Sequence, residues 1–345
     1  MIHPTNIIRV LLVDDSGFVR DMIRAALESD PGIVVVGEAS NGLEAIDKVV
    51  SLKPDIVTMD IEMPVMGGLE AIEKIIAVCP VPILAVTALT GVRTAFAAIS
   101  KGALDVIEKP DINLENVQTL IGKIRYLARV DVPTHLKSIR NRDKNGAENV
   151  IAAVTGFPKI GVIAIAASTG GPQAIHTILS HLPASFPFPI VITQHIAEGF
   201  TQGMVDWLNG STALAVVMAN NGARLAPGHV YVNPAEHSMR ISEQRIVILG
   251  ERDTCKIYNP CCDTLLSSVA SVYRKEAIGL ILSGMGDDGV AGMQAIKIAG
   301  GATLAQDAAS SVVFGMNRVA VELGCIHKVL PLVKIPAELM QRAGA

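Results

Sequence analysis

This chain of 345 residues contains few cysteines and few aromatic residues, and neither sign of charge is in large excess. The cysteines number five and form no CxxC pair, which argues against a disulfide framework or a zinc finger and favours a reducing compartment. Only 7 Phe, 4 Tyr and 1 Trp are present, too few for platforms that stack single-stranded bases. With 29 basic and 33 acidic residues, the net charge of −4 supplies no basic field for phosphate backbones. Nucleic acid is therefore not expected as a partner.

Long hydrophobic runs are also missing. Half of the residues are hydrophobic, yet no uninterrupted apolar stretch reaches the length of a membrane span. The N-terminus has no basic segment followed by an apolar stretch and a cleavage site, because the apolar run that begins at Ile7 ends in two aspartates. We expect a cytoplasmic protein without direct membrane insertion. At roughly 150 residues per domain, the length predicts two domains.

The first 129 residues alternate short β-branched runs with amphipathic stretches. The predicted strands are 7–13, 33–37, 56–59, 82–86 and 104–107. The predicted helices are 17–29, 42–52, 68–78, 92–100 and 113–128. Parallel neighbours need long crossovers, so this alternation predicts an α/β domain with a doubly wound parallel sheet in (βα)5 order. We place this domain at residues 1–129.

Residues 130–157 break the alternation and are predicted to be a linker, because they contain Pro133 and the polar run 137–148. The alternation then resumes in a second α/β domain at residues 158–345. Its predicted strands are 160–167, 189–193, 213–218, 230–232, 245–249 and 277–282, and its predicted helices are 173–181, 199–209, 262–273 and 290–299. We expect a mainly parallel sheet with a short β excursion near 228–250.

Polar residues follow the predicted strands of the first domain. They are Asp14, Asp15, Asp60, Thr87 and Lys109. The carboxyl ends of parallel strands meet at one edge of a sheet, so these side chains are expected to converge. Carboxylates without nearby His or Cys suit Mg²⁺, and an aspartate beside that ion can attack a phosphoryl donor. A lysine and a threonine hydroxyl can then hold the phosphoryl oxygens.

Each of these residues alone also fits a helix cap or an ordinary loop, but their joint occurrence disfavours that interpretation. The motifs are D-D at 14–15, D-I-E-M-P-V-M-G at 60–67, T-A at 87–88 and K-P at 109–110. Over residues 7–128 the sequence resembles the receiver domain of bacterial two-component response regulators. The resemblance implies phosphorylation of Asp60 by a partner histidine kinase. It also implies that Asp14, Asp15 and Asp60 bind Mg²⁺ and that Thr87 and Lys109 are switch residues.

A serine stands at a strand-to-helix corner of the second domain. The apolar strand 162–167 runs into Ser168, Thr169, two glycines and Pro172. Glycines permit a tight turn, and proline suits the first helical turn. The N–H groups at such a helix N-terminus favour developing negative charge. The corner therefore suits a serine nucleophile, and it equally suits a phosphate cradle or a simple helix cap.

Two further polar residues follow other strands of this domain. His195 comes after the strand 189–193, and Asp288 lies in the loop after the strand 277–282. In a parallel sheet both would lie at the same edge as Ser168, where a general base and its orienting carboxylate are needed. Each alone fits an ordinary strand-end or turn residue, whereas the three together favour catalysis. The turn is not a G-x-S-x-G elbow, because Ala166 stands two residues before the serine.

Three motifs of the second domain add a resemblance. They are A-A-S-T-G-G-P at 166–172, I-T-Q-H at 192–195 and S-G-M-G-D-D-G-V-A-G-M at 283–293. With these motifs the chain resembles the chemotaxis receptor methylesterase (CheB) family. The resemblance implies Ser168 as nucleophile, His195 as general base, Asp288 as its orienter and the Met285 backbone N–H as oxyanion donor. It implies hydrolysis of glutamate methyl esters on chemoreceptors, with release of methanol, deamidation of receptor glutamines and no cofactor for the esterase reaction.

The sequence departs from the family pattern at two places. Ala166 stands where many members have glycine, and Cys261 stands in N-P-C-C-D where serine is more usual. The vicinal Cys261 and Cys262 are interpreted as buried small residues, and a role for them is not predicted. Two alternative functions are also compatible with parts of the sequence. A non-enzymatic response regulator would bind a nucleotide or protein through the Ser-Thr-Gly-Gly turn, and a transcription factor is disfavoured because no basic recognition helix is present.

Overall fold

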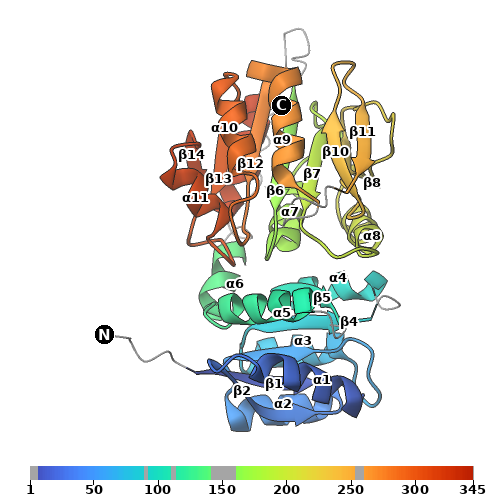
Figure 1. The fold of residues 1–345 in the computed structure, drawn as a ribbon, viewed down its shortest axis with the longest axis vertical. Coiled ribbons are helices and arrows are strands. Elements are labelled where there is room, and N and C mark those ends of the chain that lie inside the picture. Colours follow the sequence, from blue (N-terminus) through green and yellow to red (C-terminus); the bar gives the residue numbers. More distant parts are fainter. Residues whose placement is uncertain (1–6, 89–91, 110–113, 141–160, 253–259, 345) are drawn as a thin grey trace. The chain divides into compact units, whose positions relative to one another are not determined.

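The computed structural model describes residues 7–88, 92–109, 114–140, 161–252 and 260–344 (Figure 1). The chain divides into two compact units, Met1–Thr134 and His135–Ala345. The division falls inside the predicted linker.

The first unit contains a parallel sheet of five strands in the order β2-β1-β3-β4-β5. The strands are β1 (Ile8–Val13), β2 (Ile33–Ala39), β3 (Ile56–Met59), β4 (Ile83–Thr87) and β5 (Asp105–Glu108). The chain reverses its direction of travel across the sheet after β2, because β3 pairs with the other side of β1. The predicted doubly wound parallel sheet is confirmed.

Five helices cover this sheet. They are α1 (Gly17–Glu28), α2 (Gly42–Leu52), α3 (Gly68–Val78), α4 (Val92–Lys101) and α5 (Leu114–Leu127). Helix α1 contacts α5, and α3 contacts both α2 and α4, so the helices form the two layers expected of right-handed crossovers. Two N-caps show why helices begin where they do. Ser16 Oγ accepts the Val19 N–H, and Asn41 Oδ1 accepts the N–H groups of Leu43 and Glu44.

Helix α6 (Val132–Arg140) occupies the first part of the predicted linker. Irregular structure is expected there from the sequence, because residues 130–157 show no sustained apolar period. The local signals that favour this helix are Asp131, whose carboxylate accepts the Thr134 N–H and hydroxyl, and Pro133 in the first turn. The remainder of the predicted linker, residues 141–157, lies outside the described residues.

The second unit contains a parallel sheet of seven strands in the order β14-β13-β12-β6-β7-β9-β8. The strands are β6 (Val162–Ala167), β7 (Ile190–Gln194), β8 (Ala215–Met218), β9 (His229–Val232), β12 (Ala277–Ile281), β13 (Ala302–Gln306) and β14 (Lys328–Leu330). The expected parallel sheet is confirmed. Strands β13 and β14 are absent from the prediction, because one has few β-branched residues and the other is three residues long.

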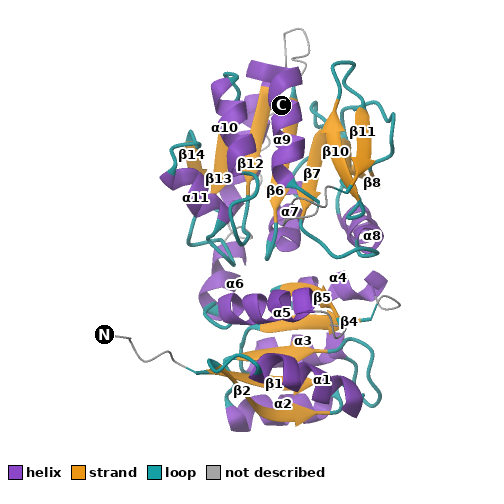
Figure 2. Cartoon of the chain, viewed as in Figure 1, coloured by secondary structure: helices purple, strands orange, loops and turns teal. Residues whose placement is uncertain are grey.

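An antiparallel pair, β10 (His237–Ile241) and β11 (Val247–Glu251), forms the predicted β excursion. The helices are α7 (Gly171–Leu179), α8 (Thr201–Ser211), α9 (Cys262–Tyr273), α10 (Val290–Ile298), α11 (Met316–Glu322) and α12 (Ile335–Ala343), with short 3-10 helices at Arg274–Glu276 and Leu332–Lys334. Helices α9, α10 and α11 form one contacting group, and α7 contacts α8 and α12 (Figure 2). The sheet is therefore covered on both faces.

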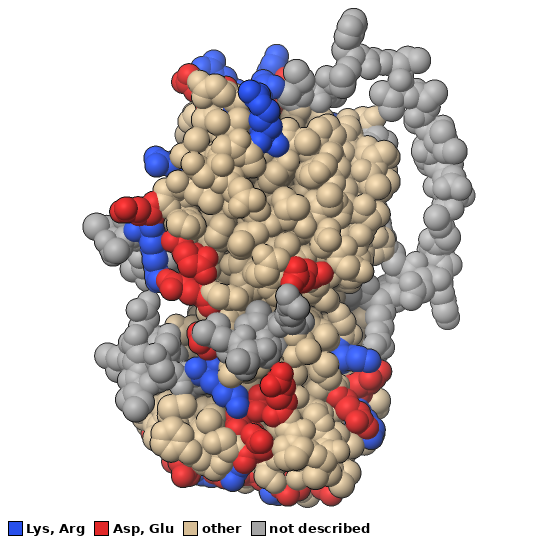
Figure 3. All heavy atoms as spheres, turned by 90° about the vertical axis from the view of Figure 1, so that its right-hand side faces the viewer, with Lys and Arg blue, Asp and Glu red and all other residues tan. Residues whose placement is uncertain are grey.

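The central strand β6 is buried along its whole length, and its side chains pack into the apolar core of the second unit. On the face displayed in Figure 3, charged side chains of the second unit are sparse, whereas acidic and basic side chains are intermixed on the first unit. Within the described ranges, no helix is both long and apolar enough to cross a membrane.

Candidate active site

Strand order brings three predicted site residues of the second unit to one edge. Strand β6 lies between β12 and β7, and all three run parallel. Ser168 directly follows β6, His195 directly follows β7, and Asp288 lies in the loop between β12 and α10. The His195 N–H donates to Ala167 O at 3.0 Å, which extends the β6–β7 pairing by one residue. This edge is where open α/β sheets bind their ligands.

Ser168 sits in a tight corner between β6 and α7. Its N–H donates to Ser283 O at 3.0 Å, and its carbonyl accepts the Gly171 N–H at 2.7 Å. Gly170 has a φ of 76°, a left-handed conformation that favours glycine. A Cβ placed on Gly284 would lie 2.7 Å from Ser168 Cβ, so glycine there lets the loop after β12 approach the serine. The serine is 8% exposed.

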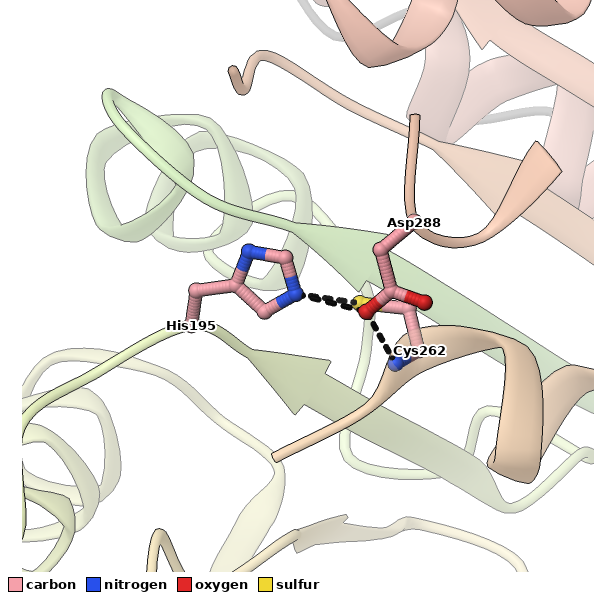
Figure 4. Close-up of side chains that lie close together, drawn as sticks. All are labelled: His195, Cys262 and Asp288. Carbon is pink, nitrogen blue, oxygen red and sulfur yellow. Dashed lines mark hydrogen bonds and ion pairs between the residues drawn. The ribbon is translucent and has the colours of Figure 1, made fainter. Parts of the chain in front are cut away.

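His195 and Asp288 form a hydrogen-bonded pair beside this corner. His195 Nε2 lies 2.7 Å from Asp288 Oδ2. Figure 4 shows the two side chains pointing toward each other. Burial opposes ionisation of Asp288, but the bond from His195 and two backbone N–H groups outweigh it and lower the pKa of Asp288 to about 2. An ionised carboxylate only accepts hydrogen bonds, so Nε2 carries a proton. In the neutral imidazole, Nδ1 is then the basic nitrogen.

The N-terminus of α9 holds the Asp288 carboxylate. The Cys262 N–H donates to Oδ2 at 2.6 Å, the Asp263 N–H donates to Oδ1 at 3.0 Å, and the Cys261 thiol lies 3.3 Å from Oδ1. Free N–H groups and the helix dipole favour an anion at this place. The sequence analysis does not identify this support. Its only sequence signal is the helix start N-P-C-C-D, in which proline precedes the first turn and Asp263 lies within it.

The loop after β12 presents the Met285 backbone next to the serine corner. The Gly284 N–H donates to Val313 O at 3.1 Å, and Gly284 O accepts the Met316 N–H at 3.0 Å, so both sides of the loop are anchored. Among the described residues, no backbone carbonyl accepts the Met285 N–H. A held backbone N–H without a backbone acceptor suits the stabilisation of an oxyanion.

The carboxylates of the first unit gather around a lysine. Lys109 Nζ lies 2.7 Å from Asp14 Oδ2 and 2.8 Å from Asp60 Oδ2. Asp15 joins Asp14 and Asp60 in a group whose carboxylate oxygens lie within 4.8 Å of one another. Three carboxylates against one ammonium leave negative charge for a dication, and an all-oxygen donor set fits Mg²⁺. The predicted residues therefore fit the predicted ion.

Burial and a like charge distinguish Asp60 in this group. Asp60 is 3% exposed and its Oδ1 accepts the Ile61 N–H at 2.7 Å. Burial raises the pKa of Asp60, the Asp14 charge adds to that effect, and the ion pair with Lys109 offsets only part of it. Burial opposes ionisation of Lys109, but the ion pairs with Asp14 and Asp60 raise its pKa. Thr87 ends β4 and is buried.

Two protein families match this chain. The CheB methylesterase family matches residues 163–339, and the response regulator receiver domain family matches residues 10–121. The chain belongs to the CheB methylesterase family. The expected family membership and receiver domain are thereby confirmed.

Two relatives match nearly the whole length of this chain. A protein-glutamate methylesterase/protein-glutamine glutaminase from Paramagnetospirillum magneticum is 46% identical over 98% of this chain and 97% of its own length. A protein of the same description from Thermotoga maritima is 37% identical over 97% of this chain and 98% of its own length. The crystal structure of the Thermotoga maritima CheB methylesterase catalytic domain is 34% identical, with a TM-score of 0.51 over 53% of this chain and 98% of that chain.

The structure shows the surroundings of the two places where the sequence departs from the CheB pattern, Ala166 and the N-P-C-C-D segment. Ala166 is fully buried in β6, and a Cβ on Gly289 would lie 3.1 Å from its Cβ, so Ala166 packs beneath the Asp288 loop. Cys261 and Cys262 are buried free cysteines, as expected of small residues. Cys262 Sγ nevertheless lies 3.5 Å from His195 Nε2, so the N-P-C-C-D segment touches the candidate catalytic groups.

Gln194 is a further residue of this site, and the sequence alone does not single it out. Its Nε2 donates to Ser168 O at 2.8 Å and to His195 O at 2.9 Å. One buried amide thereby links the backbone turns of the candidate nucleophile and the candidate base. A role in fixing their separation follows from this geometry.

Proposed function

We propose that this chain is a phosphorylation-controlled enzyme that hydrolyses glutamate methyl esters on chemoreceptors and deamidates receptor glutamines. The observation that carries the proposal is the His195–Asp288 hydrogen bond of 2.7 Å beside a serine at the corner of the central strand. An ionised orienting carboxylate, a neutral imidazole and a serine at adjacent strand ends are the parts that acyl transfer needs. The names of the relatives supply the substrate class.

In this mechanism Ser168 Oγ attacks the ester carbonyl while His195 Nδ1 accepts its proton. The Met285 N–H stabilises the oxyanion, and Asp288 stabilises the imidazolium that forms. Methanol leaves with that proton, and an acyl-enzyme remains. Water attacks the acyl-enzyme with His195 again as base, which releases the glutamate. With a glutamine substrate, ammonia leaves in place of methanol.

In the first unit, Asp60 is the proposed phosphoryl acceptor and a histidine kinase the proposed donor. Asp14, Asp15 and Asp60 would hold Mg²⁺, which offsets repulsion between the attacking carboxylate and the donor. Lys109 is 2.8 Å from Asp60 and would contact the transferred group. Thr87 is proposed as a switch residue. A cytoplasmic location accords with the free buried thiols of the second unit.

The decisive test measures methanol release from methylated receptor membranes, with and without a small phosphoryl donor. Ser168→Ala and His195→Gln are each expected to lower the rate by at least about 10⁴-fold while the protein stays folded. The double variant should be little slower than either single one, because the two groups act as a unit. Ser271→Ala is the matched control, since Ser271 is exposed on α9 and its hydroxyl donates only to Ser267 O.

Near-normal methanol release by Ser168→Ala would refute the mechanism. Labelling by a serine-directed phosphonate separates the enzyme from a non-enzymatic regulator, because a binding turn contains no activated nucleophile. We expect label on Ser168 in the wild type and no label on Ser168 in His195→Gln. Absence of label from the folded wild type would favour the binding function.

A further inference from the structure

The candidate base of this enzyme has a thiol on the same side as its carboxylate partner. Cys262 Sγ lies 3.5 Å from His195 Nε2, and Asp288 Oδ2 lies 2.7 Å from that same nitrogen (Figure 4). One ligand atom from each of the three residues lies within 4.8 Å of the other two. We call this group the His-Cys-Asp cluster. Its position has no counterpart in the mechanism above, which uses no thiol.

The donor atoms of the cluster select one class of cation. A thiolate, an imidazole nitrogen and a carboxylate oxygen suit Zn²⁺ and similar borderline-soft dications, whereas Mg²⁺ and Ca²⁺ prefer oxygen alone. With one thiolate and one carboxylate, the cluster also supplies two negative charges to a dication. The first unit offers the opposite set, because its cluster of Asp14, Asp15 and Asp60 contains only carboxylates.

The spacing of the cluster fits this class of ion. Typical Zn–S and Zn–N lengths at a tetrahedral angle place sulfur and nitrogen about 3.5 Å apart. The observed Cys262 Sγ to His195 Nε2 distance is 3.5 Å. The nitrogen and the carboxylate oxygen would need about 3.3 Å, so the pair observed at 2.7 Å must separate by roughly half an ångström. The His195 side chain is the most exposed of the three, at 13%, whereas the Asp288 side chain is 4% exposed and Cys262 is fully buried.

We propose that Zn²⁺, or another borderline-soft dication, binds the His-Cys-Asp cluster and reversibly inactivates the enzyme. The ion takes the lone pair of Nε2, so the proton of the neutral imidazole must reside on Nδ1. Nδ1 then donates and no longer accepts the proton of Ser168. One proton leaves the Cys262 thiol for solvent as the metal–sulfur bond forms. The fourth coordination position is left for water.

Binding of the metal ion and inhibition of the enzyme can be tested separately. Binding of the ion depends only on the His-Cys-Asp cluster, whereas inhibition rests on the proposed catalytic role of His195. The chain also offers a matched control, Cys261→Ser. The Cys261 thiol contacts Asp288 Oδ1, and serine removes the sulfur while it keeps a donor to that oxygen. Both cysteines precede or begin the same helix, so replacement of either perturbs similar surroundings.

The experiment uses full-length protein with Mg²⁺ in large excess, so that the carboxylates of the first unit are occupied. Zn²⁺ is titrated against methanol release, and each variant is compared with its own metal-free rate. The wild type and Cys261→Ser should lose activity over the same Zn²⁺ range and regain it with a chelator. Cys262→Ala and Cys262→Val should require at least about tenfold more Zn²⁺. Equal inhibition of the wild type and the folded Cys262 variants would overturn the proposal.

A second readout does not depend on activity. Co²⁺ replaces Zn²⁺ in such sites and gives a near-ultraviolet charge-transfer band only when a thiolate binds it. We expect that band in the wild type and Cys261→Ser, and its loss in both Cys262 variants. If the wild-type protein showed the Co²⁺ band but released no methanol, the metal site would be supported and the proposed esterase activity would be refuted. Co²⁺ that binds without the band, or no binding at all, would overturn the metal site.

Discussion

Asp60 and Asp288 are two buried aspartates at the carboxyl ends of parallel sheets, and their pKa values move in opposite directions. Both are at most 5% exposed. Burial and the neighbouring Asp14 raise the pKa of Asp60. Asp288 is equally hidden, yet hydrogen bonds from His195 and from the N-terminus of α9 lower its pKa to about 2. Burial alone therefore does not decide the charge of such a group.

The difference lies in what surrounds each carboxylate. Asp288 accepts two backbone N–H groups and an imidazole N–H, which are fixed donors that satisfy it completely. Asp60 accepts one backbone N–H, from Ile61, and shares the Lys109 ammonium with a second carboxylate, so its site retains negative charge. A satisfied anion suits the permanent orientation of a base. An unsatisfied one suits a site that takes up a cation and a phosphoryl group.

The largest expected effect is the loss of activity when Asp288, the fully hydrogen-bonded carboxylate, is replaced. Asp288→Asn should lower methanol release by about 10²- to 10⁴-fold, because an amide can donate to Nε2 and thereby move the imidazole proton to Nδ1. The loss should be smaller than that of Ser168→Ala. Asp287→Asn is the matched control, since Asp287 is the exposed neighbour in the same loop. Equal rates for the two variants would remove Asp288 from the mechanism.

A second expected effect concerns stability. A carboxyl whose pKa falls from 3.8 to about 2 on folding stabilises the fold at neutral pH by about 2 kcal/mol. That contribution is complete above the unfolded pKa and is lost as pH falls through the folded value. Asp288→Asn should therefore lower the free energy of unfolding at pH 7, and the deficit should shrink by about half at pH 3. Urea unfolding followed by the single tryptophan, Trp207 of the second unit, measures it.

A deficit that is the same at pH 7 and pH 3 would mean that packing, not ionisation, explains the destabilisation. Asp287→Asn again serves as control and should show no deficit at either pH.

Much of the fold can be predicted from the sequence, because hydrophobic periodicity and turn residues determine structure locally. The predicted bounds of α2, α3, β3 and α9 agree with the structure to the residue. The errors occur where local signals are weak. Strand β14 has three residues and β13 few β-branched ones. Both become strands by pairing with a neighbour, β13 with the edge of β12 and β14 with the edge of β13. That stabilisation is tertiary, so a short window cannot reveal it.

The site divides in the same way. The sequence indicates which residues follow strands, and strand order then brings Ser168, His195 and Asp288 to one edge. It does not indicate that α9 directs its first N–H groups at Asp288, or that Cys262 touches the imidazole. These contacts depend on packing between segments distant in the chain. The sequence also shows no sign that Gln194 bridges the two turns.

The third expected effect concerns the binding of Mg²⁺ to the carboxylate cluster that contains Asp60. Mg²⁺ should stabilise the first unit by an amount that grows with concentration, because the ion binds the folded carboxylate cluster and not the unfolded chain. Hydrogen exchange of β3 and β4 in the full-length protein should slow with Mg²⁺, and that of β6 should not change. Asp14→Ala or Asp60→Asn should abolish the effect. Asp47→Asn, an exposed aspartate on α2, should retain it. Slowing of β6 to the same extent would place the ion elsewhere.

The smallest expected effect has the opposite sign to that of Asp288→Asn. A carboxyl whose pKa is raised on folding destabilises the fold at neutral pH, and this penalty disappears as pH falls through the folded value. Asp60→Asn removes the repulsion with Asp14 and leaves Lys109 paired with Asp14. It should therefore raise the stability of the first unit at pH 7 by about 1 kcal/mol or less while it abolishes phosphorylation. Hydrogen exchange of β3 and β4 without Mg²⁺ measures the gain, and Asp47→Asn is again the control. If Asp60→Asn destabilised the first unit, the ion pair with Lys109 would stabilise the Asp60 carboxylate as effectively as the N–H groups of α9 stabilise Asp288. The proposed difference between the two aspartates would then be wrong.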